Sequence, residues 1–163
     1  MGKKLDAVRD KSREGGEVFR RSDELGKKAV SDVKQMKHLI DSLPKEVDDE
    51  IVEAAYFVSA ETKSEAEGYM RSEVGSRVEA GKRAIDASTQ AATEQVKKNE
   101  KVRAAFARMD SIGNFGRNAR AEGTVRINQS NQEFHRVINE NAEQERNAEE
   151  AYRRDLSDIS STF

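Results

Sequence analysis

The chain has 163 residues, of which 35% are hydrophobic and 37% are charged, and 29 basic side chains nearly balance 31 acidic ones. Compact globular domains usually contain about 45–50% apolar residues, whereas disordered chains usually combine high net charge with many prolines. A net charge of −2 and a single proline therefore favour helices that pack through narrow apolar stripes. The balanced charge argues against a nucleic-acid-binding domain, and the lack of cysteine excludes a disulfide framework and cysteine-ligated zinc.

No apolar run approaches the roughly 20 residues that a membrane-spanning helix needs. The first residues, Met1 to Asp6, lack the apolar stretch of a signal peptide. We therefore expect no transmembrane segment, and a protein that is either cytoplasmic or exported without a cleaved signal peptide.

The first 43 residues carry the clearest pattern in the chain. Apolar and small residues alternate there at steps of three and four, which is typical of a coiled-coil-like helix seam. The positions are Leu5, Val8, Ser12, Gly15, Phe19, Ser22, Gly26, Ala29, Val33, Met36, Ile40 and Leu43. The spacing predicts an N-terminal amphipathic helix over 5–41 within a segment of residues 1–43, and Gly15-Gly16 is expected to loosen it locally.

A break at residues 42–46 separates this segment from a predicted helical hairpin over 44–163. Proline is well tolerated at the first position of a helix, so Pro44 is expected to begin a second helix that ends near Asp110. The seam of this helix drifts toward spacings of four in its first half, as in an eleven-residue repeat. Its positions include Ile51, Ala55, Val58, Thr62, Tyr69, Val74, Val78, Ile85, Val102 and Phe106.

A second break near residues 111–116 predicts the turn of the hairpin, because Gly113 can adopt the left-handed conformation that ends a helix. The start of the third helix has two readings: residues 117–130 are helical, or a capping box at Ser130 begins the helix. Asn141 and Glu145 fall at seam positions. They are either buried polar residues that fix the helix register, or parts of a face turned to water.

Enzymatic chemistry has little support. Neither histidine, His38 or His135, belongs to the HExxH pattern or follows a glutamate by three residues, so the usual zinc and di-iron helix motifs are absent. We predict a protein that is not an enzyme and that needs no cofactor or metal.

The segment Asn114-Phe115-Gly116, between two long predicted helices, resembles the aromatic–glycine turn of WXG100 and LXG-type proteins of type VII secretion. Phenylalanine stands where that family has tryptophan, and it adjoins the glycine directly. The residues Tyr69 to Glu73 match the letters of the family's Tyr-x-x-x-Asp/Glu export signal, although they lie inside a predicted helix. The resemblance covers the architecture of residues 45–163 and implies export as a folded complex with another small helical protein or an effector domain.

The sequence thus predicts an all-α fold, either an elongated helical hairpin or a three-helix bundle with coiled-coil-like packing, that forms one domain overall. The leading functional hypothesis is non-catalytic binding of a helical protein partner, self-association, or both. The alternatives are a small substrate, partner or targeting factor of type VII secretion, and a subunit of a toxin or enzyme complex. The predicted partner-binding anchors are Phe19, Met36, Ile40, Val78, Ile85, Phe106, Phe115, Phe134, Ile138 and Tyr152.

Overall fold

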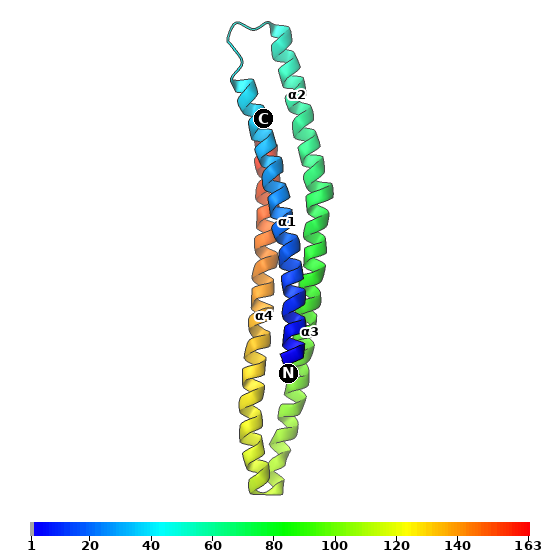
Figure 1. Ribbon diagram of the computed structural model, residues 1–163, viewed down its shortest axis with the longest axis vertical. Coiled ribbons are helices and arrows are strands. Elements are labelled where there is room, and N and C mark those ends of the chain that lie inside the picture. Colours follow the sequence, from blue (N-terminus) through cyan, green and yellow to red (C-terminus); the bar gives the residue numbers. More distant parts are fainter. Residues whose placement is uncertain (1) are drawn as a thin grey trace. The chain divides into compact units, whose positions relative to one another are not determined.

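The computed structural model describes residues 2–163, and it confirms the predicted all-α fold class (Figure 1). No strand occurs among these residues. The elements, in chain order, are α1 (Gly2–Asp41), α2 (Asp49–Tyr69), the π-helical turn η1 (Met70–Val74), α3 (Gly75–Ala107), the 3₁₀ turn η2 (Arg108–Ile112) and α4 (Asn114–Ser161).

The helices contribute to two compact units. Unit 1 contains Lys82–Glu145 together with α1 up to Gly16, and unit 2 contains Glu17–Gly81 and Arg146–Phe163. Segments of α1, α3 and α4 therefore build unit 1, whereas unit 2 takes the rest of α1, all of α2 and η1, the start of α3 and the end of α4.

Unit 1 has a core of alternating apolar and polar layers. In one apolar layer, side chains from α1, α3 and α4 meet: Val8, Ala92, Phe134 and Val137. In a neighbouring polar layer, Asn141 is fully buried; it accepts a hydrogen bond from the Ser12 hydroxyl (2.7 Å) and donates to the Ser88 hydroxyl (3.0 Å). Of the two readings of Asn141, burial is thus the correct one.

The turn between η2 and α4 lies where the glycine pattern predicted it. Gly113 has φ +85°, a conformation that side-chain-bearing residues rarely adopt, and α4 begins at the next residue. Residues 117–130 are helical. The alternative start at Ser130 is wrong, because Ser130 lies in the middle of α4. Its buried hydroxyl does not cap a helix but accepts a hydrogen bond from the Asn99 side chain of α3 (3.0 Å).

Unit 2 has an apolar core at which α1, the α2–η1 region and α4 meet. Its buried residues are Ala29, Val30, Val33, Met70, Val74 and Ile159. In Figure 1 α1 and α2 run in opposite directions and are joined by the loop of residues 42–48. The prediction that Pro44 begins the second helix is wrong: Pro44 lies in this loop, its carbonyl accepts a hydrogen bond from the Val47 amide, and α2 starts at Asp49.

Two local features of the helices relate to the sequence predictions. α1 is continuous from Gly2 to Asp41, including Gly15-Gly16. The seam spacing of four before Val74 is accommodated by the π-helical turn η1, with Met70 and Val74 both buried. A run of four-residue steps drifts around an α-helix of 3.6 residues per turn, and a wider π turn brings the stripe back to the core.

The buried polar layer of unit 1 generates a stability prediction. Asn141→Ala leaves the Ser12 and Ser88 hydroxyls without their amide partner in a closed core, and we expect the free energy of unfolding to fall by about 1–3 kcal/mol. Urea titration followed by circular dichroism at 222 nm measures this change. Asn147→Ala, the same substitution at an exposed position of α4, is the control and should change stability by less than about 0.5 kcal/mol. Equal stability of the two variants would contradict a structural role for the layer.

Candidate protein-binding groove

Unit 2 concentrates exposed apolar side chains on α2 and on the end of α1. Six of the eleven large hydrophobic residues that the structure leaves exposed lie between residues 39 and 69. They are Leu39, Ile51, Tyr56, Phe57, Val58 and Tyr69. Scattered exposed apolar residues are normal on a protein surface, but a cluster of them marks an interaction site.

A groove between α1 and α2 runs beside several of these residues. It has a volume of about 420 Å³ and is open to solvent along its length. Its lining comes from one face of α1 and the facing side of α2: Leu25, Lys28, Ala29, Asp32, Val33, Thr62, Glu65, Ala66 and Tyr69. We call this feature the α1·α2 groove.

Helical spacing extends the apolar character of the groove toward the loop that joins the two helices. On α2, the positions Ile51, Val58, Thr62 and Tyr69 are separated in turn by seven, four and seven residues, so they share one face of the helix. On α1, Met36 and Ile40 continue the face of Ala29 and Asp32 in the same way. Ile51 is 47% exposed and Val58 43%, so the extension on α2 lacks cover from unit 2 itself.

The π turn explains why Tyr69 lines the groove. Met70, the first residue of η1, is fully buried in the core of unit 2, and Tyr69 immediately before it is 37% exposed. The wide turn thus keeps Met70 and Val74 on the core side and leaves the aromatic ring on the groove wall. A π bulge next to an exposed aromatic residue is a frequent feature of functional sites.

The α1 wall of the groove carries charges of both signs, and the α2 wall carries a carboxylate. Lys28 lies on the α1 wall and Glu65 on the α2 wall, both are exposed, and neither forms an ion pair within residues 2–163. Asp32 also stands on the α1 wall, one helical turn from Lys28.

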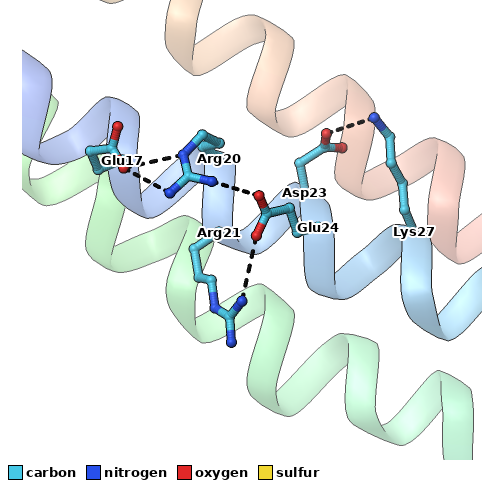
Figure 2. A network of polar contacts seen from close by, with 6 residues as sticks. All are labelled: Glu17, Arg20, Arg21, Asp23, Glu24 and Lys27. Carbon is cyan, nitrogen blue, oxygen red and sulfur yellow. Dashed lines mark hydrogen bonds and ion pairs between the residues drawn. The ribbon is translucent and has the colours of Figure 1, made fainter.

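The outward face of α1 just before the groove is different, because its charges are already paired. Figure 2 shows a row of contacts in which Arg20 binds Glu17 and Glu24, Arg21 also binds Glu24, and Lys27 binds Asp23 (2.9 Å). The hydrogen bonds that Arg20 donates to Glu17 and the negative charges of Glu17 and Glu24 raise the pKa of Arg20. This face is a self-neutralised, hydrated surface, so the unpaired Lys28 is the more available cation for a partner.

The structure distributes the predicted anchors over different environments. Four lie inside the chain's own cores: Phe19, Val78, Ile85 and Phe134. Ile138 and Tyr152 pack partly buried against these cores, Phe106 is half-buried, and Phe115 is 74% exposed at the start of α4. Met36 and Ile40, both half-buried, are the two that fall on the face of the α1·α2 groove.

Sequence reasoning missed Leu39, Ile51, Val58 and Tyr69 as surface residues. Three of them were counted among the seam positions of the second helix, but helical periodicity identifies an apolar face without saying what covers it. The drift toward four-residue spacing over this stretch was the available signal, since it marks a helix whose stripe turns away from a straight seam.

Two carboxylates are buried among helices away from the groove. In unit 1, the pKa of Glu145 is raised to about 7, mainly by burial and further by a hydrogen bond with Asp86 and by the negative charge of Asp86. The positive charge of Lys82 lowers this pKa and opposes the shift. In unit 2, Asp155 is 5% exposed, and burial followed by the charge of Asp23 raises its pKa. Burial thus shifts both carboxyl groups toward the protonated form.

Comparisons with known proteins add no relative: no protein-family model, no curated protein and no solved structure matches the chain. Within residues 2–163, no group of three or more His, Asp or Glu side chains is placed to hold a metal ion. None of the helices described here combines the length and the apolar character that crossing a bilayer requires.

The raised pKa of Glu145 predicts a pH-dependent stability. In the folded protein the pKa of Glu145 is about 7, above its ordinary value of 4.5. The resulting contribution to stability is therefore fully present below pH 4.5 and is lost as the pH rises through 7. Glu145→Gln mimics the protonated form, so we expect its melting temperature to exceed that of the native chain by a few degrees at pH 8 and by much less at pH 4. Thermal melts followed by circular dichroism measure the difference, and Glu143→Gln, at an exposed position of the same helix, is the control. A difference that does not vary with pH would show that folding leaves the pKa of Glu145 unshifted, and would contradict the prediction.

Proposed function

We propose that the protein is a non-catalytic helical interaction module that binds another polypeptide in the α1·α2 groove. The observation that carries this proposal is the exposure of Ile51, Val58 and Tyr69, which helical spacing places on the face of α2 that lines the groove. Water-exposed apolar surface of this kind is costly, and covering it contributes about 25 cal/mol for each Å² removed from water.

The shape of the groove favours a helical partner. Two adjacent helices present a furrow into which the side chains of a third helix insert, as in coiled-coil and bundle packing. Ala29 and Ala66 line the groove and keep the approach close, and Tyr69 provides a large side chain that can be buried. Aromatic residues of this type are frequent anchors of binding energy in interfaces.

The non-catalytic part of the proposal is supported by the placement of the reactive side chains. His38 and His135 are both exposed on helix surfaces. The buried polar side chains of unit 1, such as Asn99 and Asn141, are engaged in hydrogen bonds to neighbouring helices. Such satisfied pairs are typical of structural layers in helical bundles.

A second proposal, a role in type VII secretion, draws on the turn between α3 and α4. Phe115 is 74% exposed there, and a Cβ atom at Gly116 would lie 1.8 Å from the Met109 carbonyl oxygen, so only glycine fits. The expected outcome is export of the tagged chain from cells with a working type VII apparatus, reduced by Phe115→Ala. Equal export from cells that lack the apparatus would contradict it.

Affinity capture with matched variants tests the leading proposal. Val58→Asp places a charge on the groove flank and should lower the recovery of a genuine partner by about tenfold or more, because an unpaired buried carboxylate costs well over 1.4 kcal/mol. Val125→Asp is the same substitution at an exposed position of α4 and should leave recovery unchanged. Quantitative mass spectrometry compares the three proteins, and circular dichroism checks that their helix content is equal. If Val58→Asp and the native chain capture the same proteins in the same amounts, the groove is not the binding site.

A further inference from the structure

We infer that the turn between α3 and α4 binds an anionic membrane surface, with Ile112 and Phe115 inserted among the lipids and the neighbouring arginines bound to headgroup phosphates. The inference concerns unit 1 and is independent of the α1·α2 groove. It depends on three features of the turn: its exposed apolar side chains, the excess of positive charge around it, and its position at the end of the α3–α4 hairpin.

The turn leaves two large apolar side chains mostly uncovered. Phe115 has the largest exposed fraction, 74%, of any large hydrophobic residue within residues 2–163, and Ile112, three residues earlier, is 59% exposed. The turn closes without help from the Phe115 ring, because α4 approaches the Met109 carbonyl so closely at Gly116 that no Cβ atom fits there. An exposed apolar pair of this kind is available to a partner.

Positive charge is concentrated around the turn. Residues 100–126 contain six basic and three acidic side chains, a net charge of +3, whereas the rest of the chain carries −5. Two of the three carboxylates are already paired, Glu100 with Arg103 (3.1 Å) and Asp110 with Arg120. The third, Glu122, lies seven residues beyond Phe115, or about 10 Å along the helix. The surroundings of the turn are therefore complementary to a negatively charged surface.

Two exposed arginines flank the apolar pair, and in the part of the chain that the structure describes neither has a carboxylate partner. Arg108 precedes Ile112 by four residues, and Arg117 follows Phe115 by two. Arg117 donates a hydrogen bond only to the neutral side chain of Asn114. A guanidinium group binds phosphate oxygens through paired hydrogen bonds, so both arginines suit the phosphates of lipid headgroups.

The turn lies beyond the third helix of its unit. Gly2 and Leu5, at the start of α1, line a common pocket with Gln129 and Phe134 of α4. The end of the hairpin beyond this level is built from α3, η2 and α4, and the start of α1 lies short of it (Figure 1). Ile112 and Phe115 can therefore reach a flat surface without obstruction from α1.

An acidic protein or a nucleic acid fits the turn less well. A protein partner has to supply a pocket that receives Phe115, and a nucleic acid matches the arginines but not Ile112. The headgroup region of an anionic bilayer offers phosphates and acyl chains at the same place. The presence of exposed apolar and cationic side chains on one short turn thus favours a lipid surface.

Vesicle cosedimentation tests the inference with the purified full-length protein. Vesicles of phosphatidylcholine and phosphatidylserine should bind the native chain at least about tenfold more tightly than vesicles of phosphatidylcholine alone. Phe115→Ala removes the inserted ring and should weaken binding by about three- to tenfold. The double variant Arg108→Glu/Arg117→Glu reverses both flanking charges and should weaken it by more than about tenfold.

Matched variants in unit 2 separate binding by the turn from a general effect of composition. Phe57→Ala is the same substitution at another exposed phenylalanine and should leave binding unchanged. Arg77→Glu/Arg146→Glu makes the same change of net charge at exposed positions and should weaken binding by less than about threefold. Circular dichroism checks that all variants keep the native helix content.

Fluorescence gives a second measurement that does not depend on loss of binding. The chain contains no tryptophan, so Phe115→Trp introduces a single probe at the turn. Its emission should move to shorter wavelength and be quenched by brominated lipids when mixed vesicles are added. Phe57→Trp, with the probe on α2, should show neither change.

Several outcomes would overturn the inference. These are a native chain that binds no vesicles, one that binds neutral and mixed vesicles equally, and one that binds duplex DNA as tightly as mixed vesicles, which is general binding of polyanions. Sensitivity to the arginine substitutions without any effect of Phe115→Ala, and without quenching of the Phe115→Trp probe, shows adsorption without insertion and also overturns it. The proposed function is tested separately, because Val58→Asp leaves the turn unchanged.

Discussion

The narrowness of the apolar stripe on each helix is the constraint on which the rest of the structure depends. With 35% hydrophobic and 37% charged residues, the chain cannot surround its helices with apolar side chains. Small seam residues bring the helix axes close together instead, and polar side chains complete the layers that apolar ones leave open. The buried carboxamide of Asn141 holds Ser12 and Ser88 at hydrogen-bonding distance, and Gly26 leaves room for the carboxyl group of Asp155. A core of this kind specifies register through polar contacts as well as through volume.

The two units meet this constraint differently. In unit 1 the hydroxyl and amide groups of Ser12, Ser88, Asn99 and Asn141 join α1, α3 and α4, and their partners are side chains and backbone groups of the same unit. In unit 2 the core is mainly apolar, with Met70, Val74 and Ile159 at its centre. The largest apolar side chains of α2, Tyr56 and Phe57, are exposed, as are Ile51 and Val58, and Ser59 is the buried residue of this helix. Both units nevertheless leave large apolar side chains exposed, among them Ile112 and Phe115 in unit 1 and Tyr56 and Phe57 in unit 2.

Much of the fold could be predicted from the sequence, because helical periodicity and glycine punctuation are local signals. The α1 seam and the left-handed Gly113 follow directly from the spacing of residues. The π turn at Met70–Val74 could be anticipated only as a drift in spacing, since its formation depends on which side chains the neighbouring helices bury. The candidate site was the least predictable part. Periodicity places both Val58 and Phe134 on apolar helix faces, yet Phe134 is 1% exposed and Val58 is 43% exposed. Whether an apolar face is covered depends on tertiary contacts, and these are not encoded in the spacing of a single helix.

The floor of the groove and the core of unit 2 share residues, and this connects partner binding to folding. Ala29 and Val33 belong to the core cluster and also line the groove, so their inner sides contact Met70 and its neighbours while their outer sides face the opening. A partner in the groove therefore adds a second layer to the same core and binds only the folded state of α1 and α2. Any ligand that binds only the folded state stabilises it in proportion to the logarithm of its free concentration. Unit 2 should consequently gain stability with rising partner concentration, while the hydrogen-bonded layers of unit 1 have no comparable dependence. The polar layers of unit 1 and the apolar core of unit 2 are thus two ways of building a core under the same shortage of apolar residues.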